Sequence, residues 1–169
     1  MAEEDRPATL RATDVPPRPS TIYPAAYAAA MAGRAKRALG DRFGLTQFGV
    51  NLTVLAPGAA SSERHWHESE DEFVFILEGE AVLVNEQGEE RLTPGMCAGF
   101  KAGVANGHKL VNRSDAPVTY LEVGTRSEGD RVQYPDADMA AVKEDGKFRL
   151  TRKDGTPFWA PAPGGMAGG

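Results

Sequence analysis

The central part of the chain, residues 45–126, is a series of short apolar runs separated by turn residues. The runs occupy residues 45–56, 72–78, 80–85, 89–93, 96–100, 107–112 and 117–124. Between them lie dipeptides such as Pro57-Gly58 and Pro94-Gly95. Gly and Pro favour tight turns, and many short strands with regular turns are typical of an all-β sandwich or barrel. We therefore predict an all-β fold for this region.

The run 72–78 (EFVFILE) is apolar on both faces of the strand that it predicts. Val74 and Ile76 alternate with Phe73, Phe75 and Leu77, and successive side chains of a strand point to opposite faces. A strand that is apolar on both faces is normally buried on both faces. One face can fill a barrel, and the other needs a second sheet or a second subunit. We therefore expect a homodimer.

The segments on either side of this region have different patterns. Residues 1–20 are rich in proline, which predicts a loose arm. Residues 24–39 are Ala-rich, begin with a proline and are followed by Gly40, a pattern that predicts a helix. Residues 139–144 and 147–152 flank an Asp-Gly pair, which favours a β-hairpin.

These patterns divide the 169 residues into one domain with extended ends. We expect an N-terminal arm and short helix over 1–44 and a barrel over 45–126. A C-terminal hairpin extension over 127–160 is expected to pack on the barrel, and the Gly- and Pro-rich tail 161–169 to be disordered.

Charge and cysteine content narrow the range of partners and compartments. The net charge of −5 at pH 7 disfavours nucleic acids and anionic membranes as partners. No stretch approaches the roughly 18 apolar residues of a membrane span, and no signal-peptide pattern is visible at the N-terminus. Cys97 is the only cysteine, which rules out an internal disulfide and suits the cytoplasm.

The three histidines of the chain form a candidate metal site with one glutamate. His65 and His67 stand two apart, so on an extended strand both imidazoles point to one face. Glu72 begins the strong strand 72–78, and His108 lies in another predicted strand. Mixed imidazole and carboxylate ligands suit iron, manganese, nickel, zinc or copper. The alternative is that these are ordinary surface histidines.

This arrangement resembles the first motif of the cupin superfamily. Gly58 precedes the His65-Trp66-His67 triplet, four residues lead to Glu72, and six more lead to Gly79. A second segment is similar to the other cupin motif through Gly95, Phe100, Gly103, His108 and Asn112. The resemblance covers about residues 45–126.

The resemblance implies a double-stranded β-helix, a jelly-roll barrel of antiparallel strands. It also implies one divalent metal ion (Fe, Mn, Ni or Zn) on His65, His67, Glu72 and His108, often in a dimer, with Gly79 and Gly95 at turns that need a positive φ. The loop from Gly103 to His108 is two residues longer than usual. That length leaves Asn106 as an alternative fourth ligand, although imidazole binds these metals far better than an amide does.

The resemblance implies a small-molecule ligand or substrate but does not fix the reaction. We expect a metal-dependent enzyme, and dioxygenase-like chemistry fits best because no histidine remains as a free base. Glu70, Asp71 or Tyr120 are candidates for proton transfer, although the two acidic residues are expected in a solvated loop. The alternatives are a binding or sensory protein whose metal anchors a ligand, and a structural protein without metal.

Overall fold

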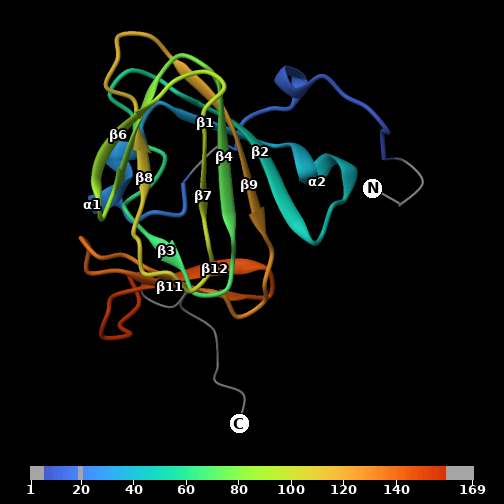
Figure 1. Cartoon of the computed structure of the whole chain (residues 1–169). Coiled ribbons are helices and arrows are strands. Elements are labelled where there is room, and N and C mark those ends of the chain that lie inside the picture. The colour runs from blue at the N-terminus through green and yellow to red at the C-terminus, as the bar shows by residue number, and fades with distance from the viewer. Residues whose placement is uncertain (1–5, 19–20, 159–169) are drawn as a thin grey trace.

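The computed structural model describes residues 6–18 and 21–158, and its main elements are twelve strands in three antiparallel sheets (Figure 1). The strands are β1 (Arg34–Ala38), β2 (Phe48–Leu55), β3 (Trp66–His67), β4 (Glu72–Glu78), β5 (Ala81–Asn85), β6 (Gly88–Leu92), β7 (Cys97–Phe100), β8 (Lys109–Val111), β9 (Val118–Thr125), β10 (Arg131–Gln133), β11 (Ala140–Glu144) and β12 (Lys147–Thr151). The helical elements are α1 (Ala25–Ala28), α2 (Leu39–Phe43) and two 3-10 turns, Ala12–Asp14 and Ala29–Met31. The prediction of an all-β fold is confirmed.

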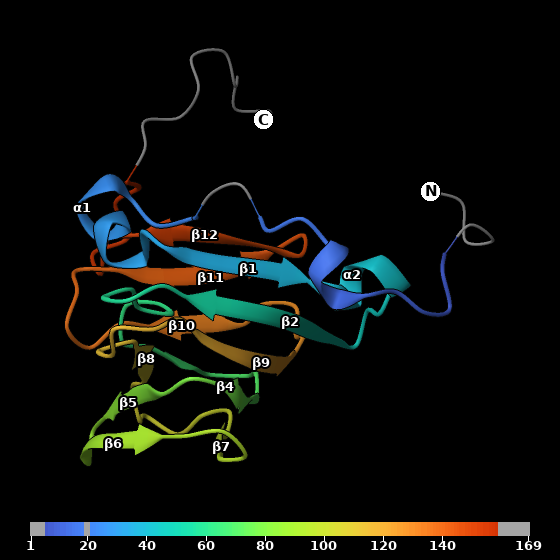
Figure 2. The same cartoon turned by 90° about the horizontal axis from the view of Figure 1, so that it is seen from above.

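The sheets follow a jelly-roll arrangement. The first has the order β1-β2-β9-β4-β7, the second β12-β11-β10-β3 and the third β6-β5-β8. Figure 1 shows β6 and β8 facing β4 and β7 across the barrel, and Figure 2 gives the same arrangement from above. Isolated bridges from His65 to His108 and from Ala60 to Val111 tie the segment before β3 to the β8 region.

The barrel core lies between the sheets, where each strand contributes every second residue. Val74 and Ile76 of β4 are buried there, as are Leu55 and Val118. Turn glycines close the strands: Gly79 has φ 73° and Gly95 has φ 89°, as their positions in the two motifs predict.

The outer face of β4 is not covered by the described part of the chain. Phe73 is 41% exposed and Leu77 is 39% exposed, so neither a second sheet nor another segment of the described chain covers them. The apolar pattern of a strand indicates that burial is favourable on both faces, but it does not indicate whether residues of the same chain bury the second face.

The helix predicted over 24–39 is wrong in its second half. The helical part ends at Met31, and residues 34–38 form β1, which pairs antiparallel with β2 from Arg34↔Leu55 to Ala38↔Asn51. Gly33 separates the two parts with φ 88°. The helix propensity of alanine is a weak preference, and pairing with the edge of the barrel sheet overrides it.

The C-terminal hairpin is confirmed as β11 and β12, with Asp145 and Gly146 at positive φ in the turn. β11 also pairs with β10, which pairs with β3, so this sheet continues into the barrel wall. A second hydrophobic core includes Tyr134 and Met139, and Tyr23 packs against it.

The remaining expectations on organisation stay predictions. The tail 161–169 and parts of the 1–20 arm lie outside the described residues, and the division at 45, 127 and 161 is not tested by the arrangement of strands. Within residues 6–18 and 21–158, no helix is long and apolar enough to cross a membrane.

Candidate metal centre

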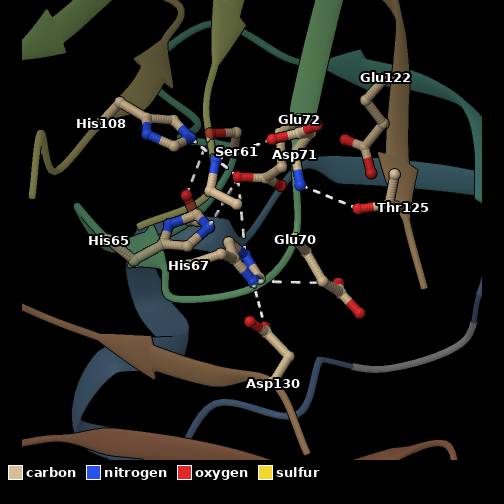
Figure 3. Close-up of polar contacts among 12 residues, drawn as sticks. Ser61, His65, His67, Glu70, Asp71, Glu72, His108, Glu122, Thr125 and Asp130 are labelled. Carbon is tan, nitrogen blue, oxygen red and sulfur yellow. Dashed lines mark hydrogen bonds and ion pairs between the residues drawn. The ribbon is translucent and has the colours of Figure 1, made fainter. Parts of the chain in front are cut away.

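Three separate segments bring the three histidines and Glu72 together (Figure 3). His65 and His67 lie on one face of the extended segment that contains β3. His108 is bridged to His65 by two backbone hydrogen bonds, 3.2 and 2.9 Å long, which place their side chains on the same face of the sheet. Glu72 begins β4, where Phe100 and Gly124 flank it on the neighbouring strands.

The four side chains converge on one carboxylate oxygen. The distances from Glu72 Oε2 are 3.0 Å to His108 Nε2, 3.6 Å to His67 Nε2 and 3.7 Å to His65 Nε2. Ligand atoms bound about 2.1 Å from one ion lie about 3.0 to 3.4 Å from each other in octahedral or tetrahedral geometry. His65, His67 and Glu72 also offer ligand atoms within 4.8 Å of one another. The residues present therefore fit a divalent ion with only small adjustments.

Hydrogen bonds to the other ring nitrogens support this arrangement. The Nδ1 atom of His65 lies 2.9 Å from the carbonyl oxygen of Glu63, that of His67 lies 2.6 Å from Asp130 Oδ2, and that of His108 lies 3.3 Å from the carbonyl oxygen of Asn106. Each acceptor fixes the proton of a neutral ring on Nδ1. The Nε2 atoms therefore face the common centre, where a metal would replace the proton that His108 Nε2 shares with Glu72 Oε2.

The electrostatics of His65 and Glu72 favour the protonation states that bind metals. Burial, together with the neighbouring His108 and His67, lowers the pKa of His65 to about 4. Burial opposes ionisation of Glu72, but the hydrogen bond from His108 and the charges of the three imidazoles outweigh it and lower its pKa. Burial also disfavours protonated His67, yet the bond to Asp130 and the nearby carboxylates raise its pKa. A neutral His65 and an ionised Glu72 are ready ligands near neutral pH.

Asn106 is placed differently from the four candidates. Its side-chain oxygen accepts a hydrogen bond from the backbone nitrogen of Glu86 at 3.1 Å, and its amide nitrogen donates to Gln87 Oε1 at 3.1 Å. The amide is thus engaged by the turn after β5, and it is His108 that contacts Glu72.

The acidic residues between His67 and Glu72 have opposite environments. Asp71 is exposed, and its side chain caps the backbone nitrogen of Ala102 at 2.8 Å. Glu70, in contrast, is only 7% exposed, so the expectation of a solvated loop is wrong for it. Its Oε1 accepts hydrogen bonds from Lys143 Nζ at 2.6 Å and from the backbone nitrogen of Ser127 at 2.7 Å. These contacts pair Glu70 with Lys143 of the C-terminal sheet.

The sequence analysis missed the partners that the C-terminal extension supplies. Asp130 is fully buried, with one oxygen 2.6 Å from His67 Nδ1 and the other accepting a hydrogen bond from the backbone nitrogen of Ser69 at 2.8 Å. Glu70, His67 and Asp130 also offer atoms within 4.8 Å of one another. Because Lys143 already neutralises Glu70, we interpret this second group as support behind His67. Asp130 follows Gly129 in a polar stretch that carries no recognisable pattern.

Two hollows give access to the centre. A pocket of about 200 Å³ is lined by Trp66, Phe100, Lys101 and Val104 in addition to residues of the cluster. The ring of Phe100 stacks parallel on His108, with ring centroids 3.4 Å apart. A larger cavity of about 1090 Å³ shares residues of the cluster and reaches the N-terminal segment and β1.

The larger cavity holds a carboxylate that is not in the cluster. Glu122 of β9 lies 2.5 Å from Lys36 Nζ, and it accepts hydrogen bonds from Asn51 Nδ2 at 2.9 Å and Thr53 Oγ1 at 3.3 Å. It is opposite Val74 on β4, one inward position from Glu72. The alternation of PVTYLEVG places Glu122 on the same face as Val118 and Tyr120, which is a signal that the sequence analysis did not use.

Comparison with known proteins connects this arrangement to a family. The family model for the Cupin domain matches residues 51–124. A sugar phosphate isomerase from a cupin superfamily, from Silicibacter pomeroyi, is 49% identical with a TM-score of 0.84, and the match covers 90% of this chain and 97% of that one. A candidate sugar phosphate isomerase from Acidithiobacillus ferrooxidans is 29% identical with a TM-score of 0.67, covering 76% and 81% of the two chains.

A polyketide cyclase from Streptomyces resistomycificus shares the fold, with 24% identity, a TM-score of 0.57 and coverage of 69% and 78%. No curated protein matches the chain.

Proposed function

This chain belongs to the cupin superfamily, and we propose that it is a mononuclear metal-dependent isomerase that acts on a small sugar-like hydroxy-carbonyl compound. The observation that carries the proposal is the position of two chemical groups in one cavity. The four candidate ligands and the separate carboxylate of Glu122 both line the larger cavity. An isomerase of this kind needs both a site that polarises a carbonyl and a base that does not bind the metal.

His65, His67, Glu72 and His108 would hold the metal. A divalent ion bound there supplies Lewis-acid polarisation of a carbonyl oxygen. Glu122 is the base that we assign: its carboxylate removes a proton from the carbon that carries the hydroxyl group and returns it to the former carbonyl carbon. The hydroxyl proton passes to the former carbonyl oxygen, so the reaction redistributes two protons and needs no oxidant.

Lys36, Asn51 and Thr53 keep Glu122 in place by the contacts described above. Tyr120 is a poor alternative base, because burial and the charge of Glu122 raise its pKa well above 10. It stays protonated at neutral pH and therefore cannot act as the base. The isomerase named among the similar proteins supports this choice of reaction.

The test is solvent hydrogen exchange. Metal-loaded protein is incubated in D₂O with aldose and ketose phosphates, and proton NMR follows the loss of the C1 and C2 signals. We expect exchange and interconversion with the wild type. Glu122→Gln should lose at least a hundredfold in rate while keeping its metal, and Glu90→Gln, an exposed glutamate of β6, serves as the control. Equal rates for Glu122→Gln and the wild type would refute this assignment.

Oxygenation is the second candidate, favoured by the ligand types. Three imidazoles and one carboxylate suit iron or manganese and leave positions open in an octahedral ion. Oxygen uptake with phenolic and keto-acid substrates separates this reaction from isomerisation, which consumes no oxygen. A protein that binds these compounds without turnover of either kind is a binding or sensory cupin.

We also propose that the outer face of β4 joins two copies in a homodimer. Phe73 and Leu77 lie exposed on that face with the half-buried Phe75 between them, and such patches favour association. Light scattering of the wild type and of Phe73→Glu tests this. The lone, free Cys97 is in keeping with a cytoplasmic location.

A further inference from the structure

The larger cavity also carries polar side chains of β1 and β9 that are not among the candidate ligands. Arg34 and Lys36 lie opposite Leu55 and Thr53 on the neighbouring strand, and both of these partners are fully buried inside the barrel. Directly opposed residues of an antiparallel pair share a face. The two cationic side chains are therefore on the inner face of β1, and both line the cavity.

Arg34 differs from the other cationic residues of the cavity in its partners. Arg18 and Arg126 pair with Asp41, Lys143 pairs with Glu70, and Lys36 pairs with Glu122. Arg34, however, donates only to the carbonyl oxygen of Ser61 and to Thr21 Oγ1 among the described residues. These two bonds fix the plane of the guanidinium, and they leave three of its five N–H donors without a partner. A half-buried guanidinium without a carboxylate is a ready site for an anion.

Tyr120 supplies a second unmet donor on the same wall. Its side chain is 1% exposed, yet its hydroxyl makes no hydrogen bond within the described residues. Thr53 lies close enough to lower the pKa of Tyr120 but outside hydrogen-bonding geometry. Tyr120, Arg34 and Glu72 all line the same cavity. A buried hydroxyl without a partner costs about 1 to 3 kcal/mol, which a bound ligand would relieve.

We propose that this part of the cavity binds the phosphate group of the substrate, with Arg34 and the Tyr120 hydroxyl as its donors. The proposal rests on the proposed function, since the metal centre in the same cavity would hold the hydroxy-carbonyl part. A phosphate monoester carries about two negative charges at neutral pH and accepts several hydrogen bonds. The planar guanidinium matches its oxygen geometry, which a single ammonium group does not.

The first experiment measures the binding of inorganic phosphate by calorimetry to the full-length protein stripped of metal with a chelator. Removing the metal ensures that phosphate cannot bind to the ion. We expect saturable binding of one phosphate per chain, at least tenfold weaker in Arg34→Gln. The matched control is Arg18→Gln, which removes an arginine of the same cavity that already pairs with Asp41, and it should leave the affinity within twofold. Acetate, the carboxylate probe, should bind at least tenfold more weakly than phosphate.

Tyr120→Phe separates a binding role from a structural one. Because the hydroxyl has no partner to lose, the variant should unfold at the same temperature as the wild type or higher. Its phosphate affinity should nevertheless fall about fivefold, the effect of one neutral hydrogen bond. An unchanged phosphate affinity in both Tyr120→Phe and Arg34→Gln would overturn the proposal. The proposal would also be overturned if the wild type bound no phosphate at about 20 mM, which is 20 times a millimolar dissociation constant. Binding of acetate as tight as that of phosphate would overturn it as well.

The phosphate-binding experiment and the D₂O exchange experiment can fail independently of each other. If phosphate binds through Arg34 but the metal-loaded protein exchanges no substrate protons with D₂O, the isomerase assignment fails and the phosphate site stands. If exchange occurs at equal rates in the wild type and Arg34→Gln at all concentrations of a sugar phosphate, the isomerase stands and the phosphate site fails.

Discussion

The hydrogen bond between His67 and Asp130 offers a sharp test of how the C-terminal extension supports the metal centre. Asp130 is fully buried and lies 2.6 Å from His67 Nδ1, while its other oxygen binds the backbone nitrogen of Ser69. Asp130→Asn keeps the size of the side chain but replaces one acceptor with an N–H donor. If the amide oxygen stays on Ser69, the new donor faces His67 Nδ1. The ring must then move its proton to Nε2, the atom that would bind the metal.

The magnitude follows from the kind of bond that is lost. A buried hydrogen bond to a charged group contributes about 1.5 to 3 kcal/mol, and about 1.4 kcal/mol corresponds to a factor of ten. Asp130→Asn should therefore weaken metal binding by about 10- to 100-fold, the range typical of partners of metal-bound histidines. Competition with a coloured chelator measures the dissociation constant, and circular dichroism in a chelator confirms that the variant is folded.

Asp136→Asn is the control, because Asp136 is an exposed aspartate near Asp130 whose partner is Arg64 at 2.6 Å. It should leave the metal affinity within twofold of the wild type. A folded Asp130→Asn protein with wild-type affinity would refute the argument that Asp130 sets the proton position of His67. If both variants bound the metal as tightly as the wild type, the C-terminal sheet would not be coupled to the site.

Three further predictions concern the ligands, the pH dependence and the turns. His65→Ala and His67→Ala should each lose bound metal after dialysis and remain folded, with a lower unfolding temperature only in the presence of metal, as elemental analysis and calorimetry would show; full occupancy in either variant contradicts its role as a ligand. In the metal-free protein, His65 has a pKa of about 4 instead of 6.5, so the unfolded chain binds more protons than the folded one between these values and stability falls as the pH decreases, by at most about 3 kcal/mol. The raised pKa of His67 lowers stability as the pH rises above 6.5. When urea titrations give the unfolding free energy at each pH, its slope against pH should differ between the wild type and His65→Gln only below pH 6.5. Gly79→Ala should destabilise the protein by about 1 to 3 kcal/mol because of its φ of 73° and because its Cβ would lie 2.4 Å from the carbonyl oxygen of Pro117; a loss below 0.5 kcal/mol in chemical denaturation contradicts this.

The strands and the convergence of the histidines could be read from the sequence because both depend on local order. The run 72–78 became β4 with the same bounds, and the alternation of side chains put His65 and His67 on one face. Turn glycines such as Gly79 are required by a local φ value. Periodicity and turn chemistry act over a few residues, so one sequence suffices to predict them.

The support of the site was decided by contacts between distant segments. Asp130 approaches His67 across 63 positions, and Lys36 meets Glu122 across 86 positions through β1, a strand that the Ala-rich pattern assigned to a helix. No local signal marks Asp130 as a buried carboxylate, because the cost of burying its charge is offset by a partner from elsewhere in the chain. The sequence by itself determined the β-rich pattern and the candidate ligands. Only the tertiary structure decided which groups orient them and which face the cavity, because burial and pairing of charges arise from packing between sheets.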